Sequence, residues 1–411
     1  MNKFYEIKTP TELLFDNKIE LLPSVTELFE YELAFLEYKS LDENEYLERT
    51  AYAKSYKGEN TLHFLKYSEI PKSVTANRSA TTNSYFKNGL FSTGYATHSL
   101  FPYRGKFHPQ LIKGLINILG IKNGETIIDP MAGSGTTNIE AALMGINSYA
   151  IDISPFCQLM TKTKFDALNI EIDLLETTKF NSSELFDFYS KHNILKTINE
   201  IEGEKRKIYH LALLAYLDAL GYSKRVVRSN HKQLFAKVLS RYIETVKNLL
   251  KNQYYNKKEI GNVEILEKSD ALNIKLADNS VDGIITSPPY SFAINYVEND
   301  KDQLEYLGYD IKQLQNQLIG LKGKTKQKKL EIYFEDMDKF CGEASRILKK
   351  NKYLVIIIGS NTNQTGGIRL EETVINSAKR YGMPLVKSIL KPIKGMRNIM
   401  KEEYVLIFEK K

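Results

Sequence analysis

Residues 127–145 read IIDPMAGSGTTNIEAALMG, and this stretch contains the pattern that decides the fold. Two isoleucines lead into Asp129, a turn with Gly133 and Gly135 follows, and TTNIEAALMG has the composition of a helix. The pattern predicts a buried strand, a glycine turn and a helix. Glycines in such a turn let a ligand approach the backbone, and the N–H groups at a helix start suit a negatively charged or polar group.

An acidic residue ends the next predicted strand, where Asp152 stands in YAIDIS. A carboxylate at this place accepts hydrogen bonds from both hydroxyls of a ribose in doubly wound nucleotide-binding folds. Together with the glycine turn, Asp152 favours a ligand with an adenosine half. The glycine spacing is not GxGxxG, which disfavours a dinucleotide. Asp270 in EKSDALN ends a later strand, where it either accepts from an adenine amino group or caps a surface turn.

Strands and helices alternate from residue 125 to the end of the chain. The predicted strands are continuous apolar runs, which are typical of parallel strands covered on both faces. We therefore predict an α/β fold with a doubly wound, mostly parallel sheet, to which the last two strands add an antiparallel edge. The predicted strands span residues 125–130, 148–153, 263–268, 281–287, 353–359, 384–390 and 402–410.

Three parts are expected along the chain. Residues 1–70 have helical apolar spacing and abundant Glu, which predicts a helical N-terminal region. Residues 71–161 and 262–411 form the sheet domain, which begins with a long polar loop at 71–105. Residues 162–261 interrupt this domain as a basic helical insert, in which two amphipathic helices flank the basic turn GYSKRVVRSNHK.

The positive charges are unevenly distributed along a chain whose formal net charge is +7. Residues 71–124 and 373–400 contain no Asp or Glu, and residues 205–258 contain thirteen Lys and Arg against two acidic residues. The lysine-rich segment 321–329 is also free of acidic residues. Clustered Lys and Arg neutralise phosphates, so several basic segments in one chain favour a polyanion partner over a merely solvated surface.

Membrane, disulfide and metal classes are disfavoured. Apolar runs such as residues 353–358 are far too short to cross a bilayer, and the N-terminus lacks the apolar region of a signal peptide. The chain has two Cys without a CxxC pair and six scattered His, which provide no metal-ligand spacing. We expect a cytoplasmic protein without a metal site.

The segment TSPPY places Ser287, Pro288 and Pro289 after the fourth predicted strand. Ligands bind at the carboxyl ends of strands in such folds. A Pro-Pro turn cannot satisfy carbonyl groups with its own N–H groups, so these acceptors and the Ser287 hydroxyl can hold an exocyclic amine. Tyr290 would then offer a flat face for stacking. The alternative is a rigid turn that ends a strand, with Tyr290 in the core.

Five motifs, in order, carry a family resemblance. FHPQL, DPMAGSGTT, AIDISP, SDA and TSPPY together resemble the S-adenosylmethionine-dependent amino-methyltransferases of DNA, over residues 98–160 and 261–411. The resemblance implies a class I methyltransferase-like Rossmann fold and S-adenosylmethionine as cofactor. It places Asp152 on the ribose, Asp270 on the adenine, and Ser287, Pro288, Pro289 and Tyr290 at the target base. The implied cofactor-binding residues are Phe107, His108, Pro109, Asp129, Pro130, Ala132, Gly133, Ser134, Gly135, Thr136, Thr137, Asp152, Ile153, Asp270, Ala271 and Ser287.

The motif SPPY more often accompanies methylation of cytosine N4 in this family. The resemblance therefore implies a site-specific cytosine-N4 methyltransferase of double-stranded DNA. A cognate restriction endonuclease that acts separately is a possible partner. Adenine-N6 methylation, methylation of RNA and a catalytically silent nucleic-acid-binding protein remain alternatives. The recognition sequence and the oligomeric state are not predicted. Expected nucleic-acid contacts are Arg104, Lys106, Lys224, Arg225, Arg228, Lys232, Lys324, Lys326 and Arg397.

Overall fold

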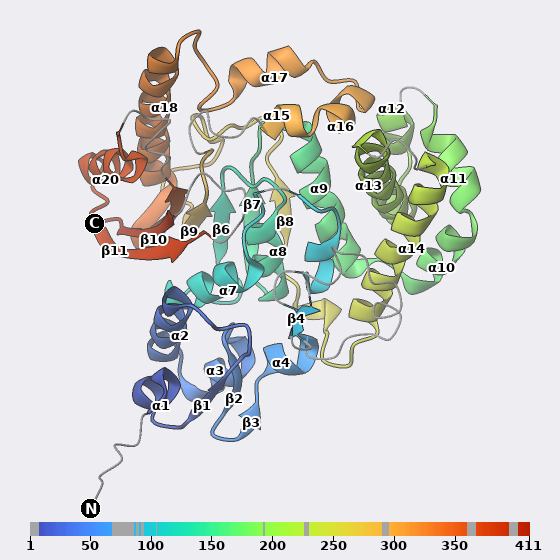
Figure 1. Cartoon of the computed structure of the whole chain (residues 1–411). Coiled ribbons are helices and arrows are strands. Elements are labelled where there is room, and N and C mark those ends of the chain that lie inside the picture. Colours follow the sequence, from blue (N-terminus) through green and yellow to red (C-terminus); the bar gives the residue numbers. More distant parts are fainter. Residues whose placement is uncertain are drawn as a thin grey trace, which may run out of the picture.

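A seven-stranded sheet forms the centre of the computed structural model, which describes residues 8–67, 86–87, 90–91, 94–103, 105–191, 194–225, 230–289, 296–359, 367–393 and 402–411 (Figure 1). The strand order is β11-β12-β10-β9-β6-β7-β8. The parallel strands are β6 (Thr126–Asp129), β7 (Asn147–Ala150), β8 (Val263–Ile265), β9 (Val281–Thr286) and β10 (Leu348–Gly359). The remaining strands are β11 (Leu385–Pro392) and β12 (Glu402–Glu409). The predicted mostly parallel α/β sheet is confirmed.

The last two strands form one edge of the sheet with antiparallel pairing. β12 runs antiparallel to both β10 and β11 and lies between them, so the edge strand β11 is parallel to the rest. The expected antiparallel edge formed by the last two strands is confirmed, with β12 as its inner strand. Residues 405–408 of β12 are buried on both faces, whereas exposed and partly buried residues dominate β11. A strand that is apolar on both faces is more stable inside the sheet than at its edge.

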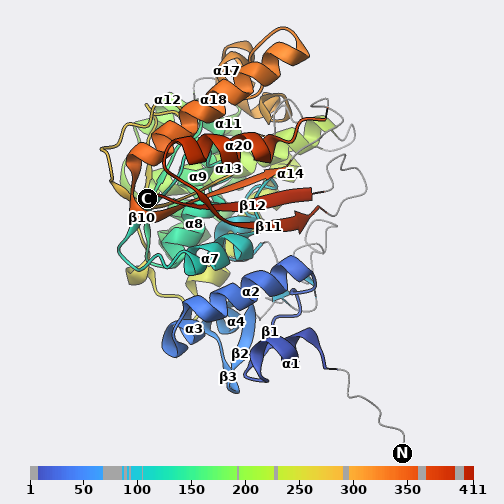
Figure 2. The same cartoon turned by 90° about the vertical axis from the view of Figure 1, so that its left-hand side faces the viewer.

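Helices cover both faces of the sheet. Adjacent strand residues point to opposite faces, so Ile285 packs towards α7 (Pro109–Ile118) while Ile284 packs towards α18 (Lys326–Ile347) and α20 (Leu370–Arg380). Figure 2 shows α18 and α20 on one side of the sheet and α7 on the other. Helices α8 (Thr136–Leu143) and α9 (Pro155–Asp166) follow β6 and β7.

The N-terminal region contains a small sheet in addition to the expected helices. Its strands β1 (Ile19–Leu21), β2 (Ala53–Tyr56) and β3 (Glu59–Asn60) pair antiparallel. They are too short for their alternation to be visible in the sequence. Their neighbours are α1 (Pro10–Phe15), α2 (Leu28–Ser40), α3 (Glu43–Arg49) and α4 (Leu62–Tyr67).

A buried polar contact joins this region to the sheet domain. The Glu37 carboxylate in α2 accepts hydrogen bonds from Asn117 Nδ2 of α7 and from Thr50 Oγ1, both at 2.6 Å. Burial raises the pKa of Glu37, and the hydrogen bonds oppose this rise. Because a buried carboxylate needs such donors, this contact fixes how α2 lies on α7.

The insert contains more helices than the two that were expected. They are α10 (Ile172–Phe180), α11 (Ser182–Tyr189), α12 (Ile194–Asn199), α13 (Gly203–Arg225) and α14 (His231–Leu250). Long α13 and α14 pack against each other through one apolar core, and the Tyr242 hydroxyl of α14 accepts from the backbone N–H of Phe101 at 2.7 Å. The boundaries of the insert remain a prediction, because α9 runs across residue 162 without a break.

Short elements complete the described chain. Helices α15 (Tyr296–Asn299), α16 (Lys301–Tyr306) and α17 (Ile311–Gln317) follow β9. One-turn helices span Ala96–Ser99, Ala167–Asn169 and Lys257–Glu259, and the two-residue strands β4 (Phe86–Lys87) and β5 (Leu90–Phe91) pair with each other. Within the described ranges, no helix has both the length and the apolar character that a membrane crossing requires.

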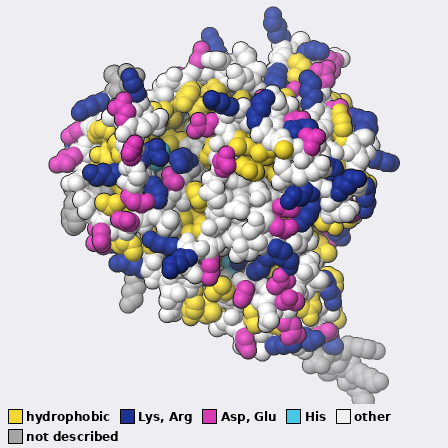
Figure 3. All heavy atoms as spheres, turned by 180° about the vertical axis from the view of Figure 1, so that it is seen from behind, with side chains coloured by type: hydrophobic (Ala, Val, Ile, Leu, Met, Phe, Trp, Pro, Cys, Tyr) yellow, Lys and Arg dark blue, Asp and Glu magenta, His cyan; other side chains and the backbone are white. Residues whose placement is uncertain are grey.

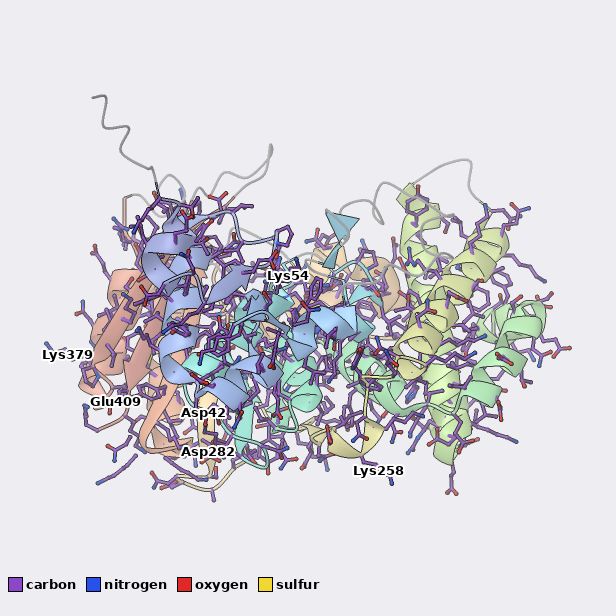
Figure 4. The ribbon with its side chains drawn as sticks, turned by 90° about the horizontal axis from the view of Figure 1, so that it is seen from below. Asp42, Lys54, Lys258, Asp282, Lys379 and Glu409 are labelled. Atoms are coloured by element: carbon purple, nitrogen blue, oxygen red, sulfur yellow. The ribbon has the colours of Figure 1, made fainter. Side chains whose placement is uncertain are left out.

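Charges of both signs alternate at the amino edge of the sheet. Lys349 Nζ lies 2.8 Å from Asp282 Oδ1, and Lys352 Nζ lies 2.6 Å from Glu125 Oε1. Asp282 at the start of β9 and Glu409 at the end of antiparallel β12 lie in the same lower part of Figure 4. The view from behind shows Lys and Arg scattered among Asp and Glu (Figure 3). The side seen from behind in Figure 3 is therefore not a uniformly basic surface.

Candidate active site

A cavity of about 620 Å³ lies at the carboxyl edge of the sheet. This volume is within the range of sites for nucleotide-sized ligands. The loops after β6, β7 and β9 and the segment after β8 all contribute side chains, because the carboxyl ends of parallel strands meet at one edge. The predicted site residues that line it are Phe107, Pro130, Ala132, Gly133, Ser134, Thr136, Asp152, Ile153, Asp270, Ala271, Ser287 and Pro289.

The glycine turn is held in a conformation that only glycine adopts easily. Gly133 and Gly135 have φ angles of 53° and 75°, in the left-handed region. A Cβ atom on Gly135 would lie 2.6 Å from Thr161 Oγ1 of α9. The Nζ of buried Lys164, also on α9, donates to the Ser134 carbonyl at 3.1 Å. Helix α9 therefore packs directly behind the turn and fixes its shape.

The Asp152 carboxylate joins this turn to the end of β7. Its Oδ2 accepts from the Gly133 N–H and its Oδ1 from the Ser154 N–H, both at 2.8 Å. Burial raises the pKa of Asp152 to about 6, against the effect of these two backbone hydrogen bonds. Each carboxylate oxygen has a further lone pair that can accept from a ligand hydroxyl.

Cofactor binding should weaken at acidic pH for this reason. Because the pKa of Asp152 lies near 6, the ionised form, which the predicted contact with two ribose hydroxyls requires, predominates only above this pH. We expect the affinity for S-adenosylmethionine to rise between about pH 5 and pH 7 and then to level off. Isothermal titration at several pH values in this range measures the affinity. The Asp152→Asn variant should bind more weakly, and its affinity should not rise with pH. An identical rise in the Asn variant would contradict the assignment.

Asp129 lies behind the cavity wall and is not one of its lining residues. Its Oδ1 accepts from Thr286 Oγ1 at 2.7 Å and from the Met131 N–H at 3.1 Å. Burial raises its pKa to about 6. The contact with Thr286 ties the end of β6 to the end of β9, so this carboxyl connects the glycine turn to the TSPP segment. A direct contact with the cofactor stays a prediction.

Only some of the residues that were predicted to contact the target base are found in the cavity wall. Ser287 and Pro289 line the cavity, whereas Pro288 is buried and is not a lining residue. The Ser287 hydroxyl donates to the Ile357 carbonyl of β10 at 2.9 Å. Tyr290 lies outside the described residues.

Four more predicted cofactor residues do not line the cavity. Gly135 and Thr137 lie at the start of α8, where they shape the turn, and His108 and Pro109 begin α7. Burial lowers the pKa of His108 to about 3, so its ring is neutral. Only the neighbouring Phe107 reaches the cavity from this segment.

Lys106 was expected at the nucleic-acid surface, but the structure places it in the cavity wall. Its Nζ donates to the His98 carbonyl at 2.8 Å, and burial lowers its pKa to about 8. His98 Nε2 lies 2.6 Å from the buried carboxylate of Glu140 in α8. The segment 98–106 is therefore attached to α8 from inside the protein, which a linear charge count could not reveal.

The remaining predicted phosphate contacts are dispersed. Lys224 and Lys232 belong to the insert and pair with Asp302 at 2.8 Å and Asp187 at 3.0 Å. Lys324 and Lys326 are exposed at the start of α18. Arg104, Arg228, Arg397 and the side chain of Arg225 lie outside the described residues.

Several lining residues carried no signal in the sequence. Cys157 and Tyr103 line the cavity side by side, with the thiol 3.5 Å from the Tyr103 hydroxyl. Tyr296 and Asp300 come from α15 and the start of α16, and residues 316–319 with Lys322 come from α17 and the loop after it. Among the residues that the structure describes, no group of three or more His, Cys, Asp or Glu side chains is arranged to hold a metal ion.

Two family profiles match the chain. The profile described as the RMKL-like methyltransferase domain matches residues 99–317, more than half of the chain, which include the glycine turn, the insert and the TSPP segment. The profile described as DNA methylase matches residues 24–162.

The chain is similar in sequence to several curated methyltransferases. The type II methyltransferase M.BsoBI of Geobacillus stearothermophilus is 27% identical over 320 residues, which cover 62% of this chain and 63% of that protein. The type II methyltransferase M.MvaI of Kocuria varians is 22% identical over 396 residues, which cover 74% of this chain and 86% of that protein. The tRNA (guanine(10)-N2)-dimethyltransferase of Methanothermobacter thermautotrophicus is 42% identical over 53 residues, which cover 13% of this chain and 16% of that protein.

The chain spans less than two thirds of the length of M.BsoBI. The match to the RMKL-like methyltransferase domain nevertheless covers the glycine turn and the TSPP segment, which both line the cavity. The cofactor that such methyltransferases use is S-adenosylmethionine, as the sequence motifs implied. The chain belongs to the family of RMKL-like methyltransferase domains.

Proposed function

We propose that this protein transfers a methyl group from S-adenosylmethionine to the exocyclic N4 amine of a cytosine extruded from double-stranded DNA. One observation carries the proposal: the glycine turn, Asp152 and Ser287 line the same cavity, although β7, the insert and β8 separate them in the chain. A donor nucleoside and an acceptor amine can therefore meet in one enclosed space. The matches to the DNA methylase profile and to two type II methyltransferases support DNA as the substrate.

The cavity fits S-adenosylmethionine by its shape and its hydrogen-bonding groups. The left-handed turn at Gly133 and Gly135 leaves backbone beside the cavity where other residues would place a side chain. Asp152 offers two acceptor oxygens for a ribose, and Asp270 and Ala271 line the cavity where the adenine is expected. When bound, the cofactor supplies a methyl group activated by a sulfonium.

Ser287 provides a matching site for an amine. Its hydroxyl hydrogen is donated to the Ile357 carbonyl, and a hydroxyl oxygen is itself a hydrogen-bond acceptor. An N–H of the target amine donates to this oxygen, and the backbone carbonyls of the Pro-Pro turn accept the second N–H. Held in this way, the amine nitrogen points its lone pair into the cavity, and most of the rate acceleration comes from proximity and alignment.

Base extrusion is required because an amine inside a duplex cannot reach an enclosed cavity. Extrusion costs a few kcal/mol, which stacking and hydrogen bonds in the pocket offset. Both cytosine and adenine have an exocyclic amine that satisfies the acceptors at Ser287. The choice of cytosine rests on Ser287 itself, since Ser at this position accompanies cytosine N4 methylation more often in the DNA amino-methyltransferases that the motifs resemble.

Nucleoside analysis tests this function directly. The purified chain is incubated with labelled S-adenosylmethionine and either duplex DNA or total RNA, and the products are digested to nucleosides and separated. We expect label in N4-methylcytosine from DNA. Label in N6-methyladenine would reject the base assignment. Label only in RNA would support the second candidate, and no label in either would reject the transfer reaction.

RNA is the second candidate substrate because of one relative. The tRNA dimethyltransferase of Methanothermobacter thermautotrophicus is 42% identical over 53 residues, and the type II methyltransferase M.MjaII of Methanocaldococcus jannaschii is equally identical over 96 residues, so RNA ranks behind DNA. An exocyclic amine of a guanine would be the corresponding acceptor.

A further inference from the structure

One side of the cavity is formed by a segment that belongs neither to the sheet nor to the helices that cover it. Asn316 and Gln317, the last two residues of α17, line the cavity together with Leu318, Ile319 and Lys322. Helix α17 begins at an Asp310 cap, whose Oδ1 accepts from the backbone N–H of Lys312 at 2.8 Å. None of these residues belongs to the five motifs that suggested the function.

Apolar residues hold this segment in place while its amides stay at the opening. Leu318 packs against the apolar core of the insert, and Ile319 packs against the core on the α18 side of the sheet. Asn316 and Gln317 are exposed although they line the cavity, so they lie at its rim. The Gln315 amide, in contrast, is directed to Glu298 Oε2 at 3.3 Å.

The chemistry of the rim suits nucleobase edges. A carboxamide has one acceptor and two donors side by side, and Asn or Gln can pair with adenine through both groups at once. A pair of exposed carboxamides at the mouth of a cavity therefore matches bases that lie across the mouth. The same geometry would not neutralise phosphate charge, which requires Lys or Arg.

Basic residues stand on both sides of this rim. Lys324 and Lys326 follow it at the start of α18 and are exposed. On the insert side, Lys224 at the end of α13 lies 2.8 Å from Asp302, and Gln303 Nε2 donates to the Leu217 carbonyl at 3.2 Å. Asp302 and Gln303 belong to α16, whose preceding residue Asp300 lines the cavity. In Figure 1, α17 lies between α18 on one side and α16 and α13 on the other, so a nucleic acid in contact with both groups of lysines would cross α17.

We propose that Asn316 and Gln317 read the bases next to the extruded base and so determine sequence context. The inference rests on the proposed function, because it requires DNA across the mouth of the cavity. The extruded base and the cofactor occupy the interior, and the rim amides contact the neighbouring nucleotides. Phosphate contacts from the flanking lysines position the strand, and the amides distinguish its bases.

The test compares sequence preferences on a random-sequence duplex library. The full-length chain and the Asn316→Ala/Gln317→Ala double variant methylate the library with S-adenosylmethionine, and modified positions are mapped at single-base resolution. We expect the double variant to lose about tenfold in discrimination at the bases flanking the target. Its affinity for S-adenosylmethionine should stay within twofold of wild type. Gln313→Ala is the matched control, since Gln313 is exposed on the same helix but does not line the cavity.

Three outcomes overturn the inference. Unchanged flanking preference in the double variant means that these amides read no bases. A large loss of cofactor affinity with unchanged preference assigns the amides to the cofactor site. A wild-type chain that methylates none of the library shows that the proposed function itself has failed, and the wild-type reaction run in parallel separates this case from the other two.

Discussion

Gly135→Ala is expected to lower the free energy of unfolding by about 4 kcal/mol and to abolish measurable binding of S-adenosylmethionine. Two costs add. A non-glycine residue is strained at a φ of 75°, and the new Cβ atom would lie 2.6 Å from Thr161 Oγ1 and 2.9 Å from Thr161 Cβ. Helix α9 cannot simply move away, because Lys164 holds the adjacent Ser134 carbonyl from the same helix. Chemical denaturation and isothermal titration measure the two effects.

Gly382→Ala is the matched control for this substitution. Gly382 has a φ of 76°, and an added Cβ atom would have no neighbour within 4 Å. It should therefore show the backbone strain alone, about 1–2 kcal/mol, with normal cofactor binding. A second change, Thr161→Ala in the Gly135→Ala background, should recover part of the lost stability. If the two glycine substitutions destabilise the protein equally, the steric conflict between residue 135 and Thr161 of α9 makes no contribution, and this prediction is contradicted.

Ser287→Ala is expected to reduce kcat for DNA methylation about 100-fold while cofactor affinity changes less than tenfold. The substitution removes the oxygen that holds the target amine, and misplacement of a reacting group by about 1 Å can cost this much. It also leaves the Ile357 carbonyl without its donor, at a cost of about 1 kcal/mol in stability. Single-turnover rates with saturating cofactor, together with titration of the cofactor alone, distinguish the two effects.

Ser280→Ala provides a control at the other end of the same strand. Ser280 precedes β9, and its hydroxyl donates to the Ala277 carbonyl at 2.6 Å, at the amino edge far from the cavity. It should lose a comparable hydrogen bond and keep the wild-type rate. A Ser287→Ala variant with wild-type kcat would remove Ser287 from the catalytic site and leave the amine to the backbone carbonyls.

The central sheet was predictable because its inner strands β9, β10 and β12 contain runs that are buried on both faces. Runs such as residues 353–358 and 405–408 are apolar without interruption, and this pattern is typical of inner strands. The place of β12 between β10 and β11 was not predictable, since strand order depends on how connections pass over the sheet. The short strands of the N-terminal region were missed because two to four residues show no period.

The loops that end β6, β7 and β9 were identified from their residue types. Gly133 follows a predicted strand and Asp152 and Ser287 stand at the ends of two others, and parallel strands place all three at one edge. The sequence did not reveal that Lys106 faces inward, because a lysine in an acid-free segment looks the same whether it meets phosphate or a buried carbonyl. It also gave no indication that Asn316 and Gln317 reach the cavity.

Local patterning by itself determined which segments form the strands of the central sheet and which chemical groups stand near their ends, since apolar runs and turn chemistry are properties of neighbouring residues. Only the tertiary structure decided which distant segments share the cavity wall. Asp129 binds Thr286 behind the cavity wall and does not line the cavity, whereas the end of α17 lies at the rim of the cavity. The physical reason is that packing between segments far apart in the chain sets the direction and surroundings of each side chain.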